Sequence, residues 1–291
     1  MKTRSMGHKE YIRALTIAGS DSGGGAGVQA DIRTMSALGV YASSAITAVT
    51  AQDTTGVGAI HTLPSEVVYD QVSRVMEDIR PMAVKIGMLP TVTCIDAVCR
   101  ALAPYYHEVP IVLDPVMTAT SGSPLIRKEA IECLRWLIIP KCKIITPNLP
   151  EAERLSGIEI KNEADMEKAA YIITEMRSEW VLIKGGHRTG RVMEDVLYDY
   201  GLPIKTFRSR KVDTVNTHGT GCTLSSAITA YLAMGHDTVT AVGMAKKYMQ
   251  RAIKAGADVK TGEGHGPVNH LFAPTRMKIV DVSDEEAIHN I

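Results

Sequence analysis

Residues 14–31 read ALTIAGSDSGGGAGVQAD, in which a short apolar run is followed by a glycine-rich segment and the start of an amphipathic stretch. Similar runs recur along the chain, each of them short and rich in Val, Ile or Ala. The other five are AITAVTAQ (45–52), AVKIG (83–87), PIVLDP (110–115), CKIITP (142–147) and WVLIKGG (180–186). Runs that are apolar on both faces are typical of central parallel strands covered by helices on either side.

Amphipathic segments separate these runs, for example SEVVYDQVSRVMEDI (65–79) and EADMEKAAYIITEMRS (163–178). Strand and helix in alternation predict a parallel sheet joined by right-handed crossovers. The predicted fold class is therefore α/β, with a central mainly parallel sheet and helices on both faces.

The alternation changes once, after the sixth apolar run. VLYDY (196–200) and KTFRSRKV (205–212) predict an antiparallel hairpin. Two consecutive helices are predicted to follow, over roughly 219–235 and 237–255.

The 291 residues contain no internal repeat, low-complexity tract or linker. A chain of this length can bury a substantial core as one α/β domain. We therefore predict a single domain over residues 11–275. Residues 1–10 and 276–291 carry no strong pattern and are predicted to be loosely attached ends.

Charge and hydropathy exclude several classes of partner. Lys plus Arg and Asp plus Glu are equal, at 32 each. Because nucleic-acid-binding domains usually present a basic surface, no nucleic-acid partner is predicted. No apolar run approaches the roughly 18 residues that a membrane span needs. The N-terminal MKTRSMGHKE lacks the apolar stretch of a signal peptide, so a cytoplasmic protein is predicted.

The five cysteines are scattered and never spaced as C-x-x-C, which argues against a disulfide framework or a zinc site. Cys94, Cys99, Cys133 and Cys142 fall within apolar or helical patterns and are predicted to be buried fillers. Cys222 lies in a different context, described below.

Polar and glycine residues gather directly after the predicted strands. In parallel sheets, ligands bind outside the carboxyl ends of the strands, which makes these positions candidates for a site. They also form ordinary turns, although a turn needs neither a lysine nor a glutamine. The residues are Gly19, Ser20 and Asp21; Gln52 and Asp53; Gly87 and Met88; Asp114 and Pro115; Pro147 and Asn148; and Lys184, Gly185 and Gly186.

The first glycine cluster, SDSGGGAGVQAD, leaves one alternative function open. Gly25, Gly27 and Ala30 satisfy G-x-G-x-x-A, and Asp53 ends the second strand roughly where a ribose-binding acid would lie. An NAD-dependent oxidoreductase is therefore an alternative, but it leaves the rest of the chain unexplained.

The second glycine cluster is more specific. NTHGTGCTLSSAITAYLAMG (216–235) leads through Gly219, Thr220 and Gly221 into an amphipathic helix. Converging backbone N–H groups and the positive end of the helix dipole predict an anion hole, suited to a transferring phosphoryl group. No P-loop motif occurs in the chain.

Cys222 lies in the first turn of this predicted helix. The positive end of the helix is expected to lower the thiol pKa, and a thiolate there could accept a proton from a substrate hydroxyl. The alternative is that Cys222 is a small residue packed under the loop.

The chain resembles the ribokinase-like superfamily, whose signature before this helix is D-T-x-G-A-G-D with a final catalytic Asp. Here the segment is NTHGTGC, which places Cys222 at the base position and resembles the hydroxymethylpyrimidine kinase branch. Six further segments also resemble that branch, and the resemblance covers roughly residues 11–273. They are LTIAGSDSGGGAGVQADI (15–32), ITAVTAQDT (46–54), VKIGML (84–89), ITPNLPEAERL (145–155), KGGH (184–187) and GHGPVNH (264–270).

The resemblance implies ATP- and Mg²⁺-dependent phosphorylation of 4-amino-5-hydroxymethyl-2-methylpyrimidine, then of its monophosphate, in thiamine diphosphate synthesis. It implies that Gln52 hydrogen-bonds the ring, that Asp31 and Gly19 line the same pocket, and that Met88 packs on the ring. It also implies a homodimer.

The resemblance implies roles at the phosphate end as well. Gly219 to Cys222 would hold the transferring phosphoryl group, with Cys222 as base. Asn148 and Lys184 would meet the nucleotide. Asp114 and Glu151 would act through Mg²⁺.

Three points stay open from the sequence. A pyridoxal or pyridoxine kinase is the nearest alternative, since that ring also bears a hydroxymethyl group, and a non-catalytic binding protein is a further one. Thr120 stands where the family often has a lysine, so the role of its loop is undetermined. His187, His218 and His265 lack helical i, i+4 spacing, which argues against a zinc site.

Overall fold

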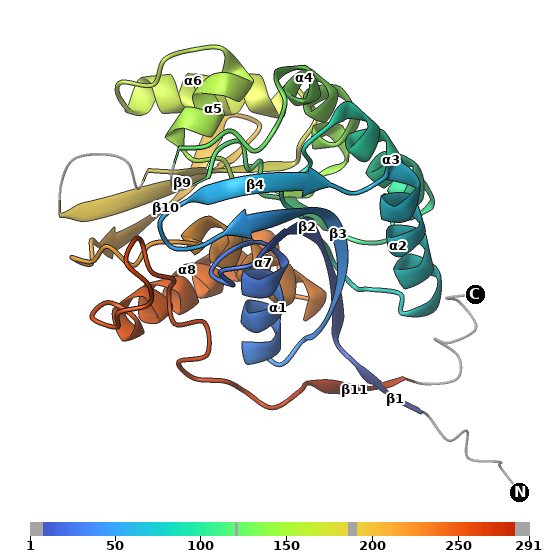
Figure 1. The fold of residues 1–291 in the computed structure, drawn as a ribbon. Coiled ribbons are helices and arrows are strands. Elements are labelled where there is room, and N and C mark those ends of the chain that lie inside the picture. The colour runs from blue at the N-terminus through green and yellow to red at the C-terminus, as the bar shows by residue number, and fades with distance from the viewer. Residues whose placement is uncertain (1–7, 120–121, 186–190, 283–291) are drawn as a thin grey trace, which may run out of the picture.

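The computed structural model describes residues 8–119, 122–185 and 191–282. Within them, one large sheet runs through the protein (Figure 1). Its strands are β2 (Arg13–Asp21), β3 (Tyr41–Gln52), β4 (Val57–Thr62), β5 (Val84–Ile86), β6 (Ile111–Leu113), β7 (Ile144–Ile145), β8 (Trp180–Lys184), β9 (Val192–Asp199) and β10 (Leu202–Arg210). Their order in space is β10-β9-β8-β7-β6-β5-β2-β3-β4.

The six strands from β8 to β3 in this order are parallel, and antiparallel pairs occur only at the two edges of the described sheet. The predicted α/β class with a mainly parallel sheet is confirmed, and the predicted hairpin is β9–β10. Edge strand β4 was not predicted. Four of its six residues are exposed, so it lacks the apolar run that marks the central strands.

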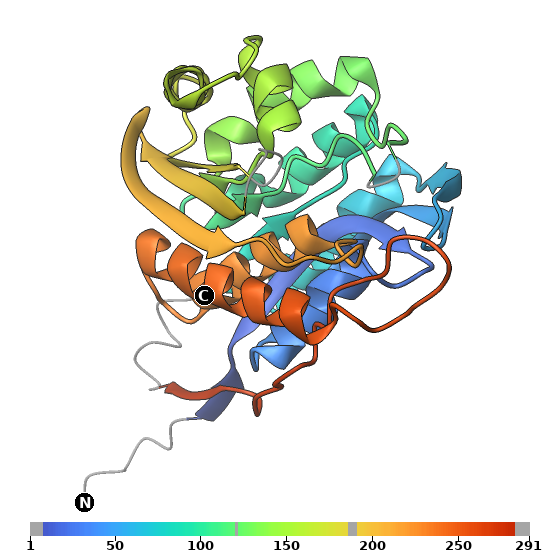
Figure 2. The same cartoon turned by 90° about the vertical axis from the view of Figure 1, so that its left-hand side faces the viewer.

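Helices cover both faces of the sheet, and each face has its own hydrophobic core (Figures 1 and 2). The larger core lies under α2 (Ser65–Asp78), α3 (Val92–Leu102), α4 (Lys128–Leu137), α5 (Leu149–Ser156) and α6 (Glu163–Thr174). The other lies under α1 (Gly27–Ala37), α7 (Thr220–Ala233) and α8 (Thr238–Ala255). Short 3₁₀ turns, η1 (Ala103–Tyr105) and η2 (Ile139–Lys141), follow α3 and α4.

Residues 8–11 and 279–282, which lie largely in the segments expected to be loosely attached, pair with each other. β1 (His8–Tyr11) and β11 (Ile279–Val282) form an antiparallel ribbon. Tyr11 also stacks on Tyr41, with ring centroids 6.1 Å apart. Each strand is too short to show a pattern on its own, so only the pairing reveals them. The single domain over 11–275 stays a prediction.

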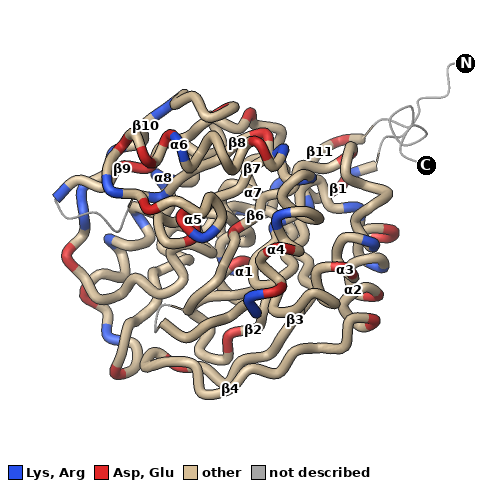
Figure 3. Tube along the Cα trace, turned by 90° about the horizontal axis from the view of Figure 1, so that it is seen from above, with Lys and Arg blue, Asp and Glu red and all other residues tan. Residues whose placement is uncertain are grey.

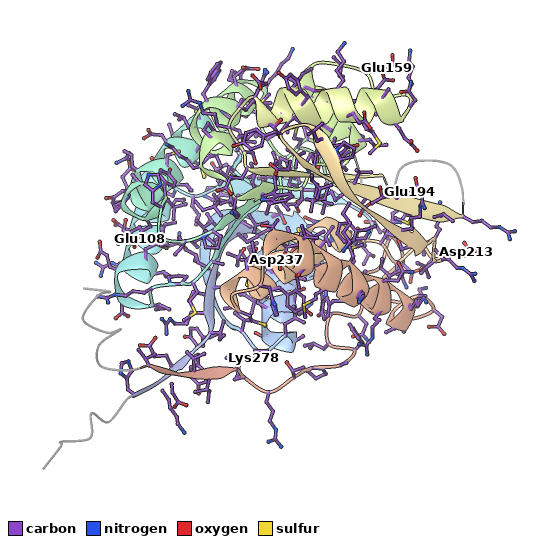
Figure 4. All side chains as sticks on the ribbon, turned by 180° about the vertical axis from the view of Figure 1, so that it is seen from behind. Glu108, Glu159, Glu194, Asp213, Asp237 and Lys278 are labelled. Carbon is purple, nitrogen blue, oxygen red and sulfur yellow. The ribbon has the colours of Figure 1, made fainter. Side chains whose placement is uncertain are left out.

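Charged residues of both signs are spread along the Cα trace (Figure 3). Among the residues labelled in Figure 4, Glu159 and Lys278 lie toward the outside of the molecule. None of the helices formed by the described residues is both long and apolar enough to cross a membrane. The five cysteines are free. Cys94 and Cys142 are buried as predicted, whereas Cys99 and Cys133 are partly exposed, which corrects the expectation for those two.

Candidate active site

The carboxyl ends of the central strands open onto a cavity of about 610 Å³. The strand ends bring side chains together that lie far apart in the sequence. The predicted site residues that line the cavity are Gly19, Gln52, Met88, Asp114, Asn148, Glu151, Lys184, Gly219, Thr220, Gly221 and Cys222. This is the edge at which parallel sheets bind ligands.

The first glycine cluster wraps around a carboxylate of its own chain. The backbone N–H groups of Gly23, Gly25 and Ala26 donate to Asp21 at 2.8, 3.1 and 2.8 Å. His218 Nε2 lies 2.9 Å from the same carboxylate. Burial raises the pKa of Asp21, but these hydrogen bonds outweigh it and the net pKa is lowered. The N–H groups that a dinucleotide would need are therefore already occupied.

Asp53, the residue that the oxidoreductase alternative assigns to the ribose, instead accepts hydrogen bonds within the turn that it begins. It is exposed, and Oδ1 accepts from Thr55 N at 2.8 Å and from Gly56 N at 3.2 Å. These are the contacts of an Asx turn. The oxidoreductase alternative thus gains no support from either of its motifs.

The second glycine cluster has the backbone geometry expected of an anion hole. Gly219 caps α7 in the left-handed conformation, with φ of 78°. Among the described residues, no acceptor is found for the backbone N–H groups of Gly221 and Cys222. Both groups lie in the first helical turn and line the cavity, so they are free to bind an anion there.

Charged side chains converge beside this hole. Lys184 Nζ, at the end of β8, lies 3.1 Å from Asp114 Oδ1 and 4.0 Å from Glu151 Oε2. A methyl group on Gly221 would lie 3.3 Å from Asp114 Oδ2 and 3.4 Å from Lys184 Nζ. Burial lowers the pKa of Lys184, but the two carboxylates outweigh it and raise the pKa, so its ammonium stays charged. A phosphate in the hole would contact both N–H groups and a cation.

Asn148 and Glu151 form a capping box at the start of α5. Asn148 Oδ1 accepts from Glu151 N at 2.9 Å, and Glu151 Oε2 accepts from Asn148 N at 2.8 Å. Burial raises the pKa of Glu151 to about 7, and Lys184 opposes that rise. The predicted nucleotide and metal residues are therefore also the structural start of a helix.

The donor set here fits Mg²⁺ delivered with a nucleotide. Mg²⁺ is usually bound through one or two carboxylates together with phosphates and water. Asp114 and Glu151 supply two carboxylates, and no cluster of three acidic, His or Cys ligands occurs in the described part of the chain. The described residues therefore do not form a complete Mg²⁺ site by themselves, and phosphates and water would supply the other ligands.

The other end of the cavity is less charged. Met88 Sδ would lie 2.9 Å from a methyl group on Gly19, so the missing side chain at Gly19 makes room for the methionine. Gln52, the last residue of β3, has Nε2 3.3 Å from His218 Nε2, and its Oε1 accepts from Thr50 at 3.2 Å. A thioether and an amide in the wall of one cavity suit a flat ring with polar edges.

Cys222 joins the two ends, but its ionisation differs from the expectation. Burial raises the pKa of Cys222 to about 12, and the nearby Lys85 ammonium and the Gly27 N–H only partly oppose this effect. The predicted lowering of its pKa is therefore wrong for the free protein. Cys222 is partly exposed at the cavity wall, but the protein atoms around it displace enough water to make desolvation the largest influence on its pKa.

A family model described as phosphomethylpyrimidine kinase matches residues 21–269. The chain belongs to this family. Among curated relatives of this kinase, the thiamine biosynthesis bifunctional protein of Geobacter sulfurreducens is 45% identical over 259 residues. The match covers 89% of this chain and 52% of that protein, so the chain spans about half the length of this relative.

Two further comparisons cover nearly the whole length of the matched proteins. The hydroxymethylpyrimidine/phosphomethylpyrimidine kinase of Bacillus subtilis is 44% identical over 260 residues, which are 89% of this chain and 94% of that enzyme. A solved ADP complex of Bacillus subtilis pyridoxal kinase has a TM-score of 0.82 at 35% identity, covering 90% of this chain and 98% of that chain. The ribokinase-like fold of this kinase is therefore shared with both groups.

The structure moves Asp31 out of the cavity wall, which corrects its predicted position in this kinase. Asp31 is fully buried and is not among the residues that line the cavity. Its carboxylate accepts from Thr16 Oγ1 at 2.6 Å, Lys85 Nζ at 2.8 Å and Ser226 Oγ at 2.5 Å. It therefore lies one layer below the site, tying α1 to β2, β5 and α7.

Several cavity residues of this kinase were missed by the sequence analysis. Lys85 could have been recognised in the sequence, because it is the one charged residue in an otherwise apolar strand. His218 was considered only for zinc. Asp195 and Lys246 pair with each other across β9 and α8, and neither stands out in the sequence. Thr120, Gly186 and His187 lie outside the described residues.

Proposed function

We propose that this protein phosphorylates the hydroxymethyl group of 4-amino-5-hydroxymethyl-2-methylpyrimidine and then the resulting monophosphate, using ATP. The observation that carries the proposal is that one cavity is lined both by Gly19, Gln52 and Met88 and by the segment from Gly219 to Cys222. Family membership and the 44% identity to a kinase of this name support the substrate.

The arrangement supports catalysis mainly by positioning and charge. The free N–H groups of Gly221 and Cys222, with Lys184, are placed to stabilise the charge on the transferring phosphoryl group. Cys222 is proposed to take the proton of the attacking hydroxyl. The slot at Gly19, Gln52 and Met88 would hold the ring with its hydroxymethyl group toward Cys222.

We propose that Asp114 and Glu151 hold Mg²⁺ together with the phosphates of ATP, with Asn148 near the nucleotide. When bound, the ion neutralises charge on the phosphate oxygens. Lys184 already lies between the two carboxylates and prevents uncompensated burial of negative charge before the nucleotide binds.

A pyridoxal kinase is the second candidate, because the pyridoxal kinase from Bacillus subtilis has the same fold over 90% of this chain. A substrate panel separates the two. ADP release is measured with the hydroxymethylpyrimidine, its monophosphate, pyridoxal and pyridoxine, and products are identified by mass spectrometry. The pyrimidine is expected to give the highest kcat/KM, and a clear preference for pyridoxal would overturn the proposal.

Gln52→Ala tests the ring slot. A side-chain amide offers a donor and an acceptor, as an aminopyrimidine edge does, so its removal leaves ring positions unpaired. We expect the pyrimidine to bind more weakly by about 1–3 kcal/mol, with ATP affinity near that of the wild type. Gln250→Ala is the control, because Gln250 lines the same cavity and its amide donates to Arg210 O. An unchanged pyrimidine affinity in Gln52→Ala would remove Gln52 from the site.

Metal removal tests the carboxylates. Activity should disappear in excess chelator and return with added Mg²⁺. Glu151→Gln keeps an oxygen for the capping box but loses the charge, so it should need several-fold more Mg²⁺ for half-maximal rate. Glu163→Gln, in the first turn of α6, is the matched control. Full activity in excess chelator would contradict the role of Mg²⁺.

The location and the oligomeric state of the protein are also proposed. We propose that the protein is cytoplasmic. The homodimer implied by the resemblance is also a proposal, and light scattering during size-exclusion chromatography measures it directly.

A further inference from the structure

Lys85 is a buried cation that the mechanism above does not use. It occupies the middle of β5, and its side chain is 0% exposed to solvent. It nevertheless lines the cavity together with Met88 and Cys222. Lysine is seldom buried without a partner, so its surroundings have to account for its charge.

Asp31 supplies the counter-charge. Its Oδ2 lies 2.8 Å from Lys85 Nζ, and the same carboxylate accepts from Thr16 and from Ser226. Ser226 lies one helical turn beyond Cys222 on α7. Asp31 therefore fixes the ammonium relative to the helix that carries the anion hole.

Two N–H groups of the ammonium remain after this bond. An ammonium has three donors, and Asp31 is the one side-chain or backbone acceptor found for Lys85 among the described residues. The chain also leaves room for Nζ at the cavity floor. A methyl group on Gly87 would lie 2.6 Å from Nζ and 3.1 Å from Ala18 Cβ, so only glycine leaves this position open.

The two remaining donors would serve a ligand oxygen bound beside Cys222. The cavity wall beside Lys85 includes Cys222, and the Lys85 charge is the strongest of the influences that lower the Cys222 pKa. Under the proposed function, the hydroxymethyl group of the substrate lies against Cys222. We propose that Lys85 is a further catalytic residue, which donates a hydrogen bond to the acceptor oxygen of the pyrimidine, and that Asp31 is its positioning residue.

Lys85 keeps its protons throughout the phosphoryl transfer. The hydroxyl oxygen forms a bond to the γ-phosphorus, the bond between that phosphorus and the β–γ bridging oxygen breaks, and ADP leaves. The hydroxyl proton goes to Cys222 in its thiolate form, which becomes the neutral thiol. Asp31 raises the pKa of Lys85 although burial lowers it, so the ammonium keeps its protons and stabilises the developing alkoxide by its charge.

The test compares two ligands in the absence of nucleotide, by calorimetry. They are 4-amino-5-hydroxymethyl-2-methylpyrimidine and 4-amino-2,5-dimethylpyrimidine, which lacks only the hydroxyl. The full chain is expected to prefer the hydroxymethyl ligand by about 10- to 100-fold, the range of a hydrogen bond to a charged group. In the double variant Asp31→Asn with Lys85→Met, affinity for the dimethyl ligand should stay while the preference falls to near one.

A second buried pair provides the control. Asp195→Asn with Lys246→Met removes another ion pair that lines the same cavity, and it should keep the preference. If the Asp31 and Lys85 variant does not fold, Gly87→Ala displaces Nζ without removing the charge and should reduce the preference.

The outcomes separate the two proposals. The role of Lys85 is overturned if the Asp31→Asn with Lys85→Met variant keeps the preference for the hydroxymethyl ligand. If that double variant does not fold, the same conclusion follows when Gly87→Ala keeps the preference. A wild type with no preference for the hydroxyl also overturns it, while ATP-dependent phosphorylation of the pyrimidine would leave the proposed function standing. A wild type that binds neither pyrimidine overturns the proposed substrate and this inference with it.

Discussion

Cys222→Ser is expected to lower kcat by roughly 10²- to 10⁴-fold, the usual contribution of a positioned general base. Serine keeps the size of the side chain and the N–H groups of the anion hole, but it is a far weaker base. Turnover is measured at saturating substrates, with stability followed by denaturant unfolding. Near wild-type turnover with unchanged stability would show that Cys222 only fills space beneath the loop.

Cys94→Ser is the matched control for this variant. Cys94 is likewise a thiol in the first turn of a helix; it is buried, and burial raises its pKa to about 12 as well. It is not among the residues that line the cavity. Its replacement is expected to change stability slightly and kcat very little, so any large loss at Cys222 reflects its place in the site.

The raised pKa of Cys222 predicts the direction in which kcat/KM changes with pH. Because that pKa is about 12 in the free protein, the thiolate fraction should grow about tenfold with each pH unit in the neutral range. If the thiolate is the base, kcat/KM should rise with pH there. Cys222→Asp should recover part of the activity lost in the serine variant and flatten the rise, since its carboxyl ionises at lower pH. A flat wild-type profile would contradict proton transfer to the thiolate.

Gly219→Ala is expected to damage both stability and activity. Gly219 has φ of 78°, and an added Cβ would lie 1.9 Å from the backbone oxygen of Gly25. The two glycine clusters touch here, so one has to move. We expect a loss of about 1–3 kcal/mol in the free energy of unfolding. Since displacement of about 1 Å can cost about 10²-fold in rate, kcat should fall by at least that factor.

Gly235→Ala isolates the cause. Gly235 has a similar φ of 85°, but no neighbouring atom lies within 4 Å of an added Cβ. That variant bears the cost of the left-handed backbone alone, about 1–2 kcal/mol, and should keep its activity. If Gly219→Ala matched it in kcat, close contact between the clusters would not be needed for catalysis.

The α/β class, the central strands and the order of the helices could be predicted from the sequence. Short runs that are apolar on both faces, alternating with amphipathic segments, are a local signal that needs no tertiary information. The same holds for the anion hole, because glycines before a helix make free N–H groups from local geometry. Both features depend on neighbours in the chain.

The tertiary structure decided the pairing of β1 with β11, the edge strand β4 and the surroundings of the site. Asp31 was expected in the cavity and lies beneath it, and the thiol of Cys222 was expected to be acidic and is not. Lys85 and His218 entered the site only through contacts between distant segments. The residue types that can do chemistry are visible in the sequence, but burial and the partners of each charge are set by the whole fold. Desolvation and long-range pairing therefore decided which polar residues face the ligand and which support those that do.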